Sequence, residues 1–177
     1  KGTNFAHYKG IDDLIEQGIR VTFSEGYDYG ISSPSCYLLA FTDHKRNTIV
    51  CDGFYQPEME IEDQAAAMAR IRADWGVESK ASIMADPSLN KRQAGSGVKG
   101  KTIAQQFWHA QSKIVMARAD NDIIDGVTRV RAMLAVQKTK INPFTAQYGC
   151  PSLMFSNNCP YVIDELSDYY WDKNKFN

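Results

Sequence analysis

The chain has 177 residues, a length that suits one compact domain with its own core and is short for two. Apolar residues make up 44% of it and charged residues 23%, which excludes disordered, collagen-like and coiled-coil proteins. The net charge of −1 gives no overall attraction to nucleic acid or to a membrane surface.

Cysteine usage and the absence of targeting signals indicate a reducing compartment. The four cysteines form no C-x-x-C pair and are not clustered with the three histidines, so we expect neither a zinc cage nor a disulfide framework. No apolar run has the length of a membrane span, and the N-terminal residues lack the apolar core of a signal peptide. We therefore expect a cytoplasmic protein without a membrane partner, with residues 1–20 as a linker and residues 21–177 as one domain.

The first half of the domain is predicted to be a β-meander. Segments rich in β-branched and aromatic residues, bounded by turn residues, predict strands at Val21–Gly30, Cys36–Thr42 and Thr48–Tyr55. The connections between them are too short for crossover helices. The three strands should therefore be antiparallel.

The second half alternates helices with short strands. Its most regular helix, Glu62–Trp75, is followed by Gly76 as a C-terminal stop. The remaining predicted elements are strands Ala81–Ala85, Lys113–Ala117 and Leu153–Asn157, and helices Ile103–Gln111, Asp122–Val136 and Tyr161–Trp171. In the helix Asp122–Val136, we expect Ile124, Val127, Val130 and Leu134 to point inward. This order predicts an α/β fold with a mixed sheet, three antiparallel strands and then parallel ones, flanked by helices in the ribonuclease H-like arrangement.

Two aspartates, Asp28 and Asp86, stand at predicted strand ends. Asp28 lies between glycines that leave its carboxylate open to approach, and Asp86 ends an apolar run and precedes Pro87. Two carboxylates brought together repel unless a cation lies between them. Hard ions such as Mg²⁺ or Mn²⁺ prefer such oxygen ligands and activate water in phosphodiester cleavage. The alternative is that each acid is a turn residue or a helix cap.

Basic residues are concentrated in the middle of the chain, because residues 87–119 contain six Lys and Arg and no acid. Those that follow Asp86 are candidates to hold phosphate oxygens beside it. They are Lys91, Arg92, Lys99 and Lys101. The alternative is a solvated surface loop without a partner.

The segment Gly95–Thr102 also matches the G-x-x-x-x-G-K-T pattern of phosphate-binding loops in nucleotide triphosphatases. Such a loop begins directly after a buried strand, whereas polar residues separate Gly95 from the strand that ends at Asp86. The chain after Thr102 also has too few predicted strands to complete a parallel sheet. The sequence therefore favours a flexible basic loop over a nucleotide site.

Other polar candidates have structural explanations. Asp122 and Asp125 stand where a helix is predicted to begin, and a cap or a favourable charge at the helix N-terminus accounts for them. His109 lies beside Phe107 and Trp108 on a predicted helix, and we expect a structural role.

The motifs together resemble one known family. They are Gly26-Tyr-Asp28-Tyr-Gly30, Ala85-Asp86-Pro87-Ser88, Asp122-Ile-Ile-Asp125-Gly126-Val127, and Glu165 with Tyr169-Tyr170-Trp171. In their order and spacing, the chain resembles the C-terminal nuclease domain of the large terminase subunit of tailed bacteriophages, which packages and cuts viral DNA. The resemblance covers roughly residues 21–172.

The resemblance implies a metal-dependent endonuclease for double-stranded DNA with a ribonuclease H-like fold, in which Asp28 and Asp86 match the first two metal ligands. The implied cofactor is one or two Mg²⁺ or Mn²⁺ ions. An N-terminal ATPase domain, the portal and the small terminase subunit are the implied partners, and the host cytoplasm is the implied location. The family's third acid, in an Asp-His-x-x-Asp-Ala type of motif, has no counterpart in this sequence. We expect that ligand to be missing, or to be supplied by Asp122, Asp125 or another acid.

Two other functions remain open at this point. One is a nucleotide triphosphatase that uses Gly95–Thr102. The other is a ribonuclease H-like module that binds or docks DNA without a metal site.

Overall fold

The computed structural model describes residues 16, 18, 20–30, 33–77, 82–91, 100–110 and 114–168. The strands are β1 (Val21–Asp28), β2 (Ser35–Asp43), β3 (Thr48–Gln56), β4 (Ile83–Ala85), β5 (Met116–Arg118), β6 (Gln137–Ile141), β7 (Tyr148–Cys150) and β8 (Leu153–Phe155). The helices are α2 (Ile61–Asp74), the short 3₁₀ helix η1 (Pro87–Asn90), α3 (Ile103–His109), α4 (Ile123–Leu134) and α5 (Pro160–Asp168).

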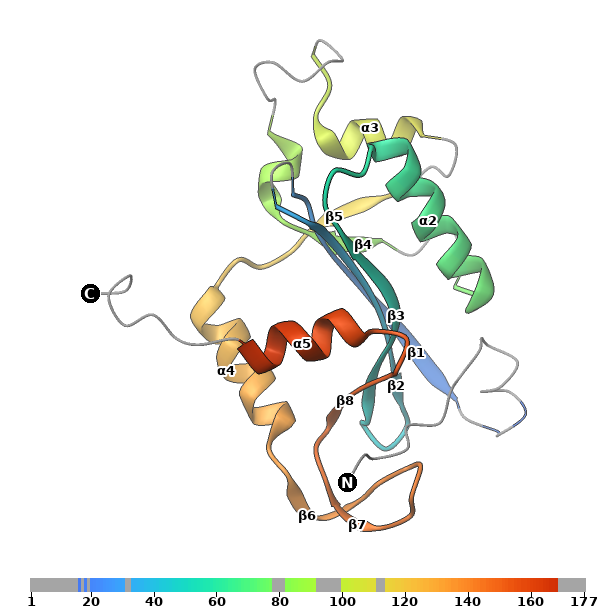
Figure 1. Cartoon of the computed structure of the whole chain (residues 1–177), viewed down its shortest axis with the longest axis vertical. Helices are drawn as coiled ribbons and strands as arrows, with labels where there is room; N and C mark the ends of the chain where they lie inside the picture. Colours follow the sequence, from blue (N-terminus) through green and yellow to red (C-terminus); the bar gives the residue numbers. More distant parts are fainter. Residues whose placement is uncertain are drawn as a thin grey trace.

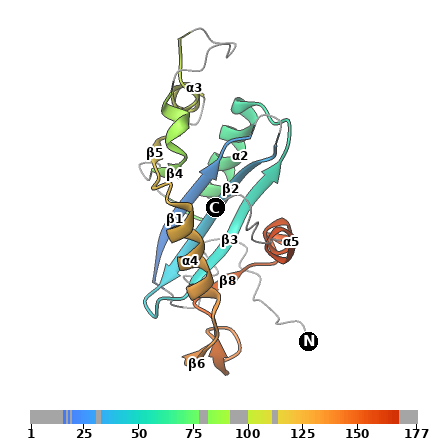
Figure 2. The same cartoon turned by 90° about the vertical axis from the view of Figure 1, so that its left-hand side faces the viewer.

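One mixed sheet organises the molecule, with strand order β5-β4-β1-β2-β3-β8, and β6 and β7 form a separate pair. The predicted meander is confirmed, because β1 pairs with β2 and β2 with β3 in antiparallel fashion. Parallel strands flank the meander on both sides: β4 pairs with β1, β5 with β4, and β8 with β3. In Figures 1 and 2, α2 and α3 lie on one side of this sheet, whereas α4 and α5 lie on the other.

The main core lies between the sheet and α2. Alternate residues of β2, namely Tyr37, Leu39 and Phe41, are buried on this face, as a strand with one covered side requires. From α2, Met68 and Ile71 join the same buried cluster. A smaller cluster containing Val50, Leu153 and Cys159 lies apart from it.

The prediction that the apolar face of the helix at 122–136 points inward is wrong. No residue of α4 is buried; Ile124 is 59% exposed, Val130 37% and Leu134 36%, and Val127 is only half-buried. The residue of α4 that packs against the smaller cluster is Met133. Helical periodicity in a sequence identifies an apolar face but not the element that covers it.

Two other differences concern short strands. The strand predicted at Lys113–Ala117 is Met116–Arg118, displaced toward the C-terminus, and the β6–β7 pair was not predicted. Gln137–Ile141 is polar and mostly exposed, so it carries none of the apolar signal by which a strand is recognised. No helix in the described ranges is long and apolar enough to span a membrane.

A buried ion pair attaches β1 to α2. The Nε and Nη2 atoms of Arg72 lie 3.0 and 3.1 Å from the two carboxylate oxygens of Glu25, and both residues are almost fully buried. The Tyr37 hydroxyl donates a further hydrogen bond of 2.7 Å to Glu25. Burial, and then the charge of Glu25, raise the pKa of Tyr37, so this hydroxyl stays a donor.

Replacing one partner of the Glu25–Arg72 pair should destabilise the fold strongly. We expect Arg72→Met to lower the free energy of unfolding by about 3–5 kcal/mol, because it leaves the Glu25 charge buried and unpaired. Urea unfolding measures the change. Arg70→Ala is the control, since the Arg70 side chain is 71% exposed and its pair with Asp74 spans 3.7 Å, so the expected loss is under about 1 kcal/mol. Equal losses in the two variants would contradict this interpretation.

Candidate functional site

The parallel pairing of β1 with β4 brings the two predicted aspartates together. Tyr27 pairs with Ala85, so the next residues, Asp28 and Asp86, lie side by side where the two strands end. Neighbouring strands are about 4.8 Å apart, and paired residues point to the same face of a sheet. Tyr27 and Ala85 are buried on the α2–α3 side, and Asp28 and Asp86 therefore project from the opposite face.

Hydrogen bonds from Ser88 and Asn121 hold both carboxylate oxygens of Asp86. Its Oδ1 accepts a 2.6 Å bond from the Ser88 N–H and so caps η1, while Oδ2 accepts a 2.5 Å bond from Nδ2 of Asn121. Hydrogen bonds from Ser88 and Asn121 hold the pKa of Asp86 below its usual value. Asp86 therefore has the role of helix cap that was the alternative interpretation of the sequence. Its carboxylate is nevertheless held in a defined orientation at the end of β4.

A row of register partners extends from Asp28 across the sheet. Asp28 pairs with Cys36 on β2, and Cys36 pairs with Tyr55 on β3. Burial, followed by the nearby charges of Asp28 and Glu165, raises the pKa of the Cys36 thiol to about 11. Hydrogen bonding to Glu165 is likewise the largest cause that raises the pKa of Tyr55. Glu165 of α5 therefore lies near Cys36 and Tyr55, at the end of this row of residues that is opposite to Asp28.

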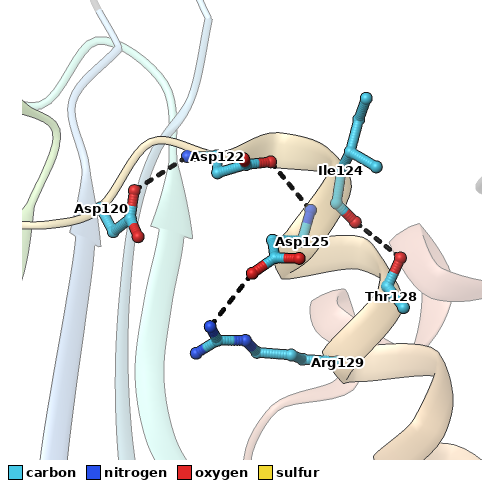
Figure 3. Close-up of polar contacts among 6 residues, drawn as sticks. All are labelled: Asp120, Asp122, Ile124, Asp125, Thr128 and Arg129. Atoms are coloured by element: carbon cyan, nitrogen blue, oxygen red, sulfur yellow. Dashed lines mark hydrogen bonds and ion pairs between the residues drawn. The ribbon is translucent and has the colours of Figure 1, made fainter.

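Three further aspartates lie where β5 leads into α4, as Figure 3 shows. Asp122 caps α4 by accepting a 2.9 Å bond from the Asp125 N–H, and Asp125 pairs with Arg129 at 3.1 Å. The predicted capping role of Asp122 is confirmed. Asp120, which sequence reasoning missed, accepts a 3.2 Å bond from the Asp122 N–H. Its position two residues after β5 is the signal that could have singled it out.

A cavity of about 760 Å³ opens beside these acids. Asp120, Asn121 and Asp122 line one part of it, and the exposed apolar side of α4 lines another, with Leu166 of α5 contributing from across the gap. Three of the four apolar residues predicted to face the core, Val127, Val130 and Leu134, thus line an open groove instead.

Within the described residues, no three His, Cys, Asp or Glu side chains are grouped so that they could hold one metal ion. The strand ends bring together Asp28 and Asp86, and neither Asp122 nor Asp125 completes a group of three with them. His109 is exposed at the end of α3, and the structure gives it no partner within these residues that would define a role.

Comparisons with known proteins agree with this arrangement at the level of the fold. No family model and no curated protein matches the chain. Two solved structures match with 87% of the chain covered: the nuclease domain of the P22 large terminase, and the large terminase of a thermophilic bacteriophage. The first is 15% identical with a TM-score of 0.56, and the second is 17% identical with a TM-score of 0.58. The chain shares the fold of these two phage proteins.

The match covers 71% of the P22 domain but only 33% of the large terminase chain from the thermophilic phage. The shared fold, a mixed α/β sheet of the ribonuclease H-like type, was predicted correctly from the sequence. Since both identities are low, the comparisons establish the fold and leave the chemistry to the residues of this chain.

Two of the basic candidates flank η1 and α3, which contact each other. Lys91 directly follows η1 and is exposed, and Lys101 lies two residues before α3 and is half-buried. Arg92 and Lys99 lie outside the described residues.

The described part of the phosphate-loop pattern Gly95–Thr102 has a structural explanation. Residues 95–99 lie outside the described ranges, but Thr102 forms a capping box with Gln105 at the start of α3. Its hydroxyl accepts a 3.1 Å bond from the Gln105 N–H. Strand β4 also leads into η1 rather than directly into this loop.

Two substitutions of Asp122 distinguish its role as a helix cap from a role as a metal ligand. Asn is as good an N-cap as Asp, so Asp122→Asn should leave both the free energy of unfolding and the Mn²⁺ affinity unchanged. Asp122→Ala should lower the free energy of unfolding by about 1 kcal/mol, because alanine cannot cap α4. Urea unfolding and calorimetric titration with Mn²⁺ provide the two measurements. Weaker Mn²⁺ binding by Asp122→Asn would make Asp122 a ligand.

Proposed function

We propose that the chain is a metal-dependent endonuclease domain that cuts double-stranded DNA during viral genome packaging. The observation that carries the proposal is the placement of Asp28 beside Asp86 at the ends of two parallel strands, in a fold shared with the nuclease domain of a phage terminase. Fold alone does not define chemistry, so the proposal rests on this pair of carboxylates.

The two carboxylates fit a hard divalent ion. Asp28 is exposed, and no group in the described residues donates a hydrogen bond to its side chain, so its oxygens are open to a ligand. Asp86 is held ionised and oriented by its own hydrogen bonds. Mg²⁺ is commonly bound through one or two carboxylates with water and substrate phosphate as the other ligands, which suits a site of two acids. Such an ion, when bound, activates water and stabilises the leaving oxygen in phosphodiester hydrolysis.

The protein's own groups define where the DNA backbone is cut. Asp28 and Asp86 place two negative charges at one sheet edge, which repel a bare phosphate and so make cutting depend on the cation. Lys91 and Lys101, at the neighbouring ends of η1 and α3, supply positive charge for the phosphates that flank the cut. We extend this role to Arg92 and Lys99. Phosphate contacts carry no sequence information, so we expect cutting with little sequence preference.

The wider assembly follows from the same proposal. The match spans about a third of the thermophilic phage's large terminase, so in our proposal the domain acts as one part of a packaging motor. Its other partners would be an ATPase domain, the portal and the small terminase subunit, and its location the host cytoplasm.

Two experiments distinguish the nuclease from the two other functions that the sequence left open. ATP binding that disappears in Lys101→Ala would support a nucleotide triphosphatase. Salt-sensitive DNA binding without any Mn²⁺ binding would support a DNA-docking module without catalysis.

Removing one charge of the acid pair should abolish cleavage. We expect Asp28→Asn to lose all nicking of supercoiled plasmid in Mg²⁺ or Mn²⁺, because the amide keeps the shape of the side chain but loses its charge. Its circular dichroism spectrum and thermal midpoint should match those of the wild type, since Asp28 is exposed. Asp63→Asn, an exposed site on α2 across the sheet, is the control and should cut normally. Cutting by Asp28→Asn at the wild-type rate would refute the assignment.

Basic residues near the acid pair should control the salt dependence of DNA binding. Replacing both Lys91 and Lys101 with Ala should weaken binding, and should reduce the slope of log K against log salt by about 0.9 per lost phosphate contact. Fluorescence anisotropy with a labelled duplex in EDTA gives the slope without cleavage. The control replaces Lys45 and Lys138, exposed residues of the β2–β3 turn and β6. A slope equal to that of the wild type would place Lys91 and Lys101 away from DNA.

A further inference from the structure

We propose that Asn121 is a positioning residue for the acid pair: its amide holds the Asp86 carboxylate in the orientation that binds the metal ion. The inference rests on the proposed nuclease function and adds a residue that no sequence motif identified. It is carried by the 2.5 Å hydrogen bond from Asn121 Nδ2 to Asp86 Oδ2, which joins groups 35 residues apart in the chain.

The hydrogen bonds of Asp86 fix the plane of its carboxylate. The last torsion of an aspartate side chain is broad and has no single preferred value. Here the Ser88 N–H holds Oδ1 and Asn121 holds Oδ2, so rotation about that torsion would break both bonds. A carboxylate has about four lone-pair positions, and the bonds from Ser88 and Asn121 do not use all of them, so a cation can still bind. Without Asn121, only the bonds from Ser88 would remain.

Asn121 is itself held from both sides. The Ala119 N–H donates a 2.8 Å bond to the Ala85 carbonyl, which extends the β4–β5 pairing past the end of β5. On the other side of Asn121, Asp122 caps α4 and its N–H bonds to Asp120. The backbone of Asn121 therefore lies between a strand end and a helix start, and its amide is directed at the residue that ends the neighbouring strand.

Orientation of this kind affects metal binding more than stability. Groups that hydrogen-bond a metal ligand typically change metal affinity or activity by about 10- to 100-fold when removed. Asn121 and Ser88 are both exposed, and Asp86 is only half-buried, so water can replace the lost amide in the unliganded protein. If Asn121 had only a structural role, linking the β5–α4 connection to β4, its substitution would lower the unfolding midpoint and leave the Mn²⁺ affinity unchanged.

The test measures Mn²⁺ binding to the metal-free chain without DNA, from the electron paramagnetic resonance signal of free Mn²⁺. We expect Asn121→Ala to weaken Mn²⁺ binding about tenfold or more, with an unchanged thermal midpoint. Asn90→Ala, an exposed asparagine at the end of η1, is the matched control and should bind as the wild type does. In plasmid nicking, Asn121→Ala should need about tenfold more Mn²⁺ for half-maximal rate and keep the wild-type rate at saturating Mn²⁺.

Whether Asn121 acts through Asp86 is tested by repeating the Asn121 substitution in an Asp86→Ala variant. In Asp86→Ala, adding Asn121→Ala should change the remaining Mn²⁺ affinity by less than about twofold, because the partner of the amide is gone. An equal loss in both backgrounds would mean that Asn121 acts independently of Asp86 and would overturn the proposal. Unchanged Mn²⁺ affinity in the single variant would overturn it as well, while leaving the nuclease assignment standing if the wild type binds Mn²⁺ and cuts DNA. A wild-type chain that binds no Mn²⁺ would refute both.

Discussion

The short parallel pairing of β1 with β4 is the constraint on which the candidate site depends. It joins the antiparallel meander to the parallel strands β4 and β5, and its register is fixed because Tyr27 and Ala85 are both buried on the α2–α3 side. A slip of one residue would turn one of the two buried side chains out to solvent. The same slip would separate Asp28 from Asp86. Core packing on one face of the sheet therefore sets the geometry of the acids on the other.

The buried polar groups of β1 reinforce this register. Glu25 is paired with Arg72 of α2, and the Tyr27 hydroxyl donates to Gln64 of the same helix. Because side chains alternate along a strand, two inward contacts at positions 25 and 27 leave position 28 facing outward. A polar anchor needs more exact geometry than an apolar contact, since an unsatisfied charge in the core is strongly unfavourable. The anchor thus limits how far the end of β1 can move.

The sequence predicted the features that depend on local pattern. The meander, the helix after it and the strand that ends at Asp86 follow from periodicity and turn residues, and the fold and the adjacent placement of Asp28 and Asp86 followed from their order. The exposure of α4 was not predicted, because an amphipathic helix has the same sequence pattern whether or not another element covers its apolar face. Asn121 was not predicted either, since its partner lies on another strand and neutral amides carry no motif.

The contacts of Asp86 also bear on how strongly the proposed site would hold an ion. Hydrogen bonds from Ser88 and Asn121 favour the ionised carboxylate, which is the form that binds a cation. The same bonds hold both of its oxygens, so the carboxylate is kept in one orientation. With Asp28 as its neighbour, and no third acid grouped with them in the described residues, the site suits an ion that is completed by water and a substrate phosphate. A nuclease built in this way would bind its metal measurably on its own and more tightly when DNA is in place, which couples the cutting chemistry to the presence of its substrate.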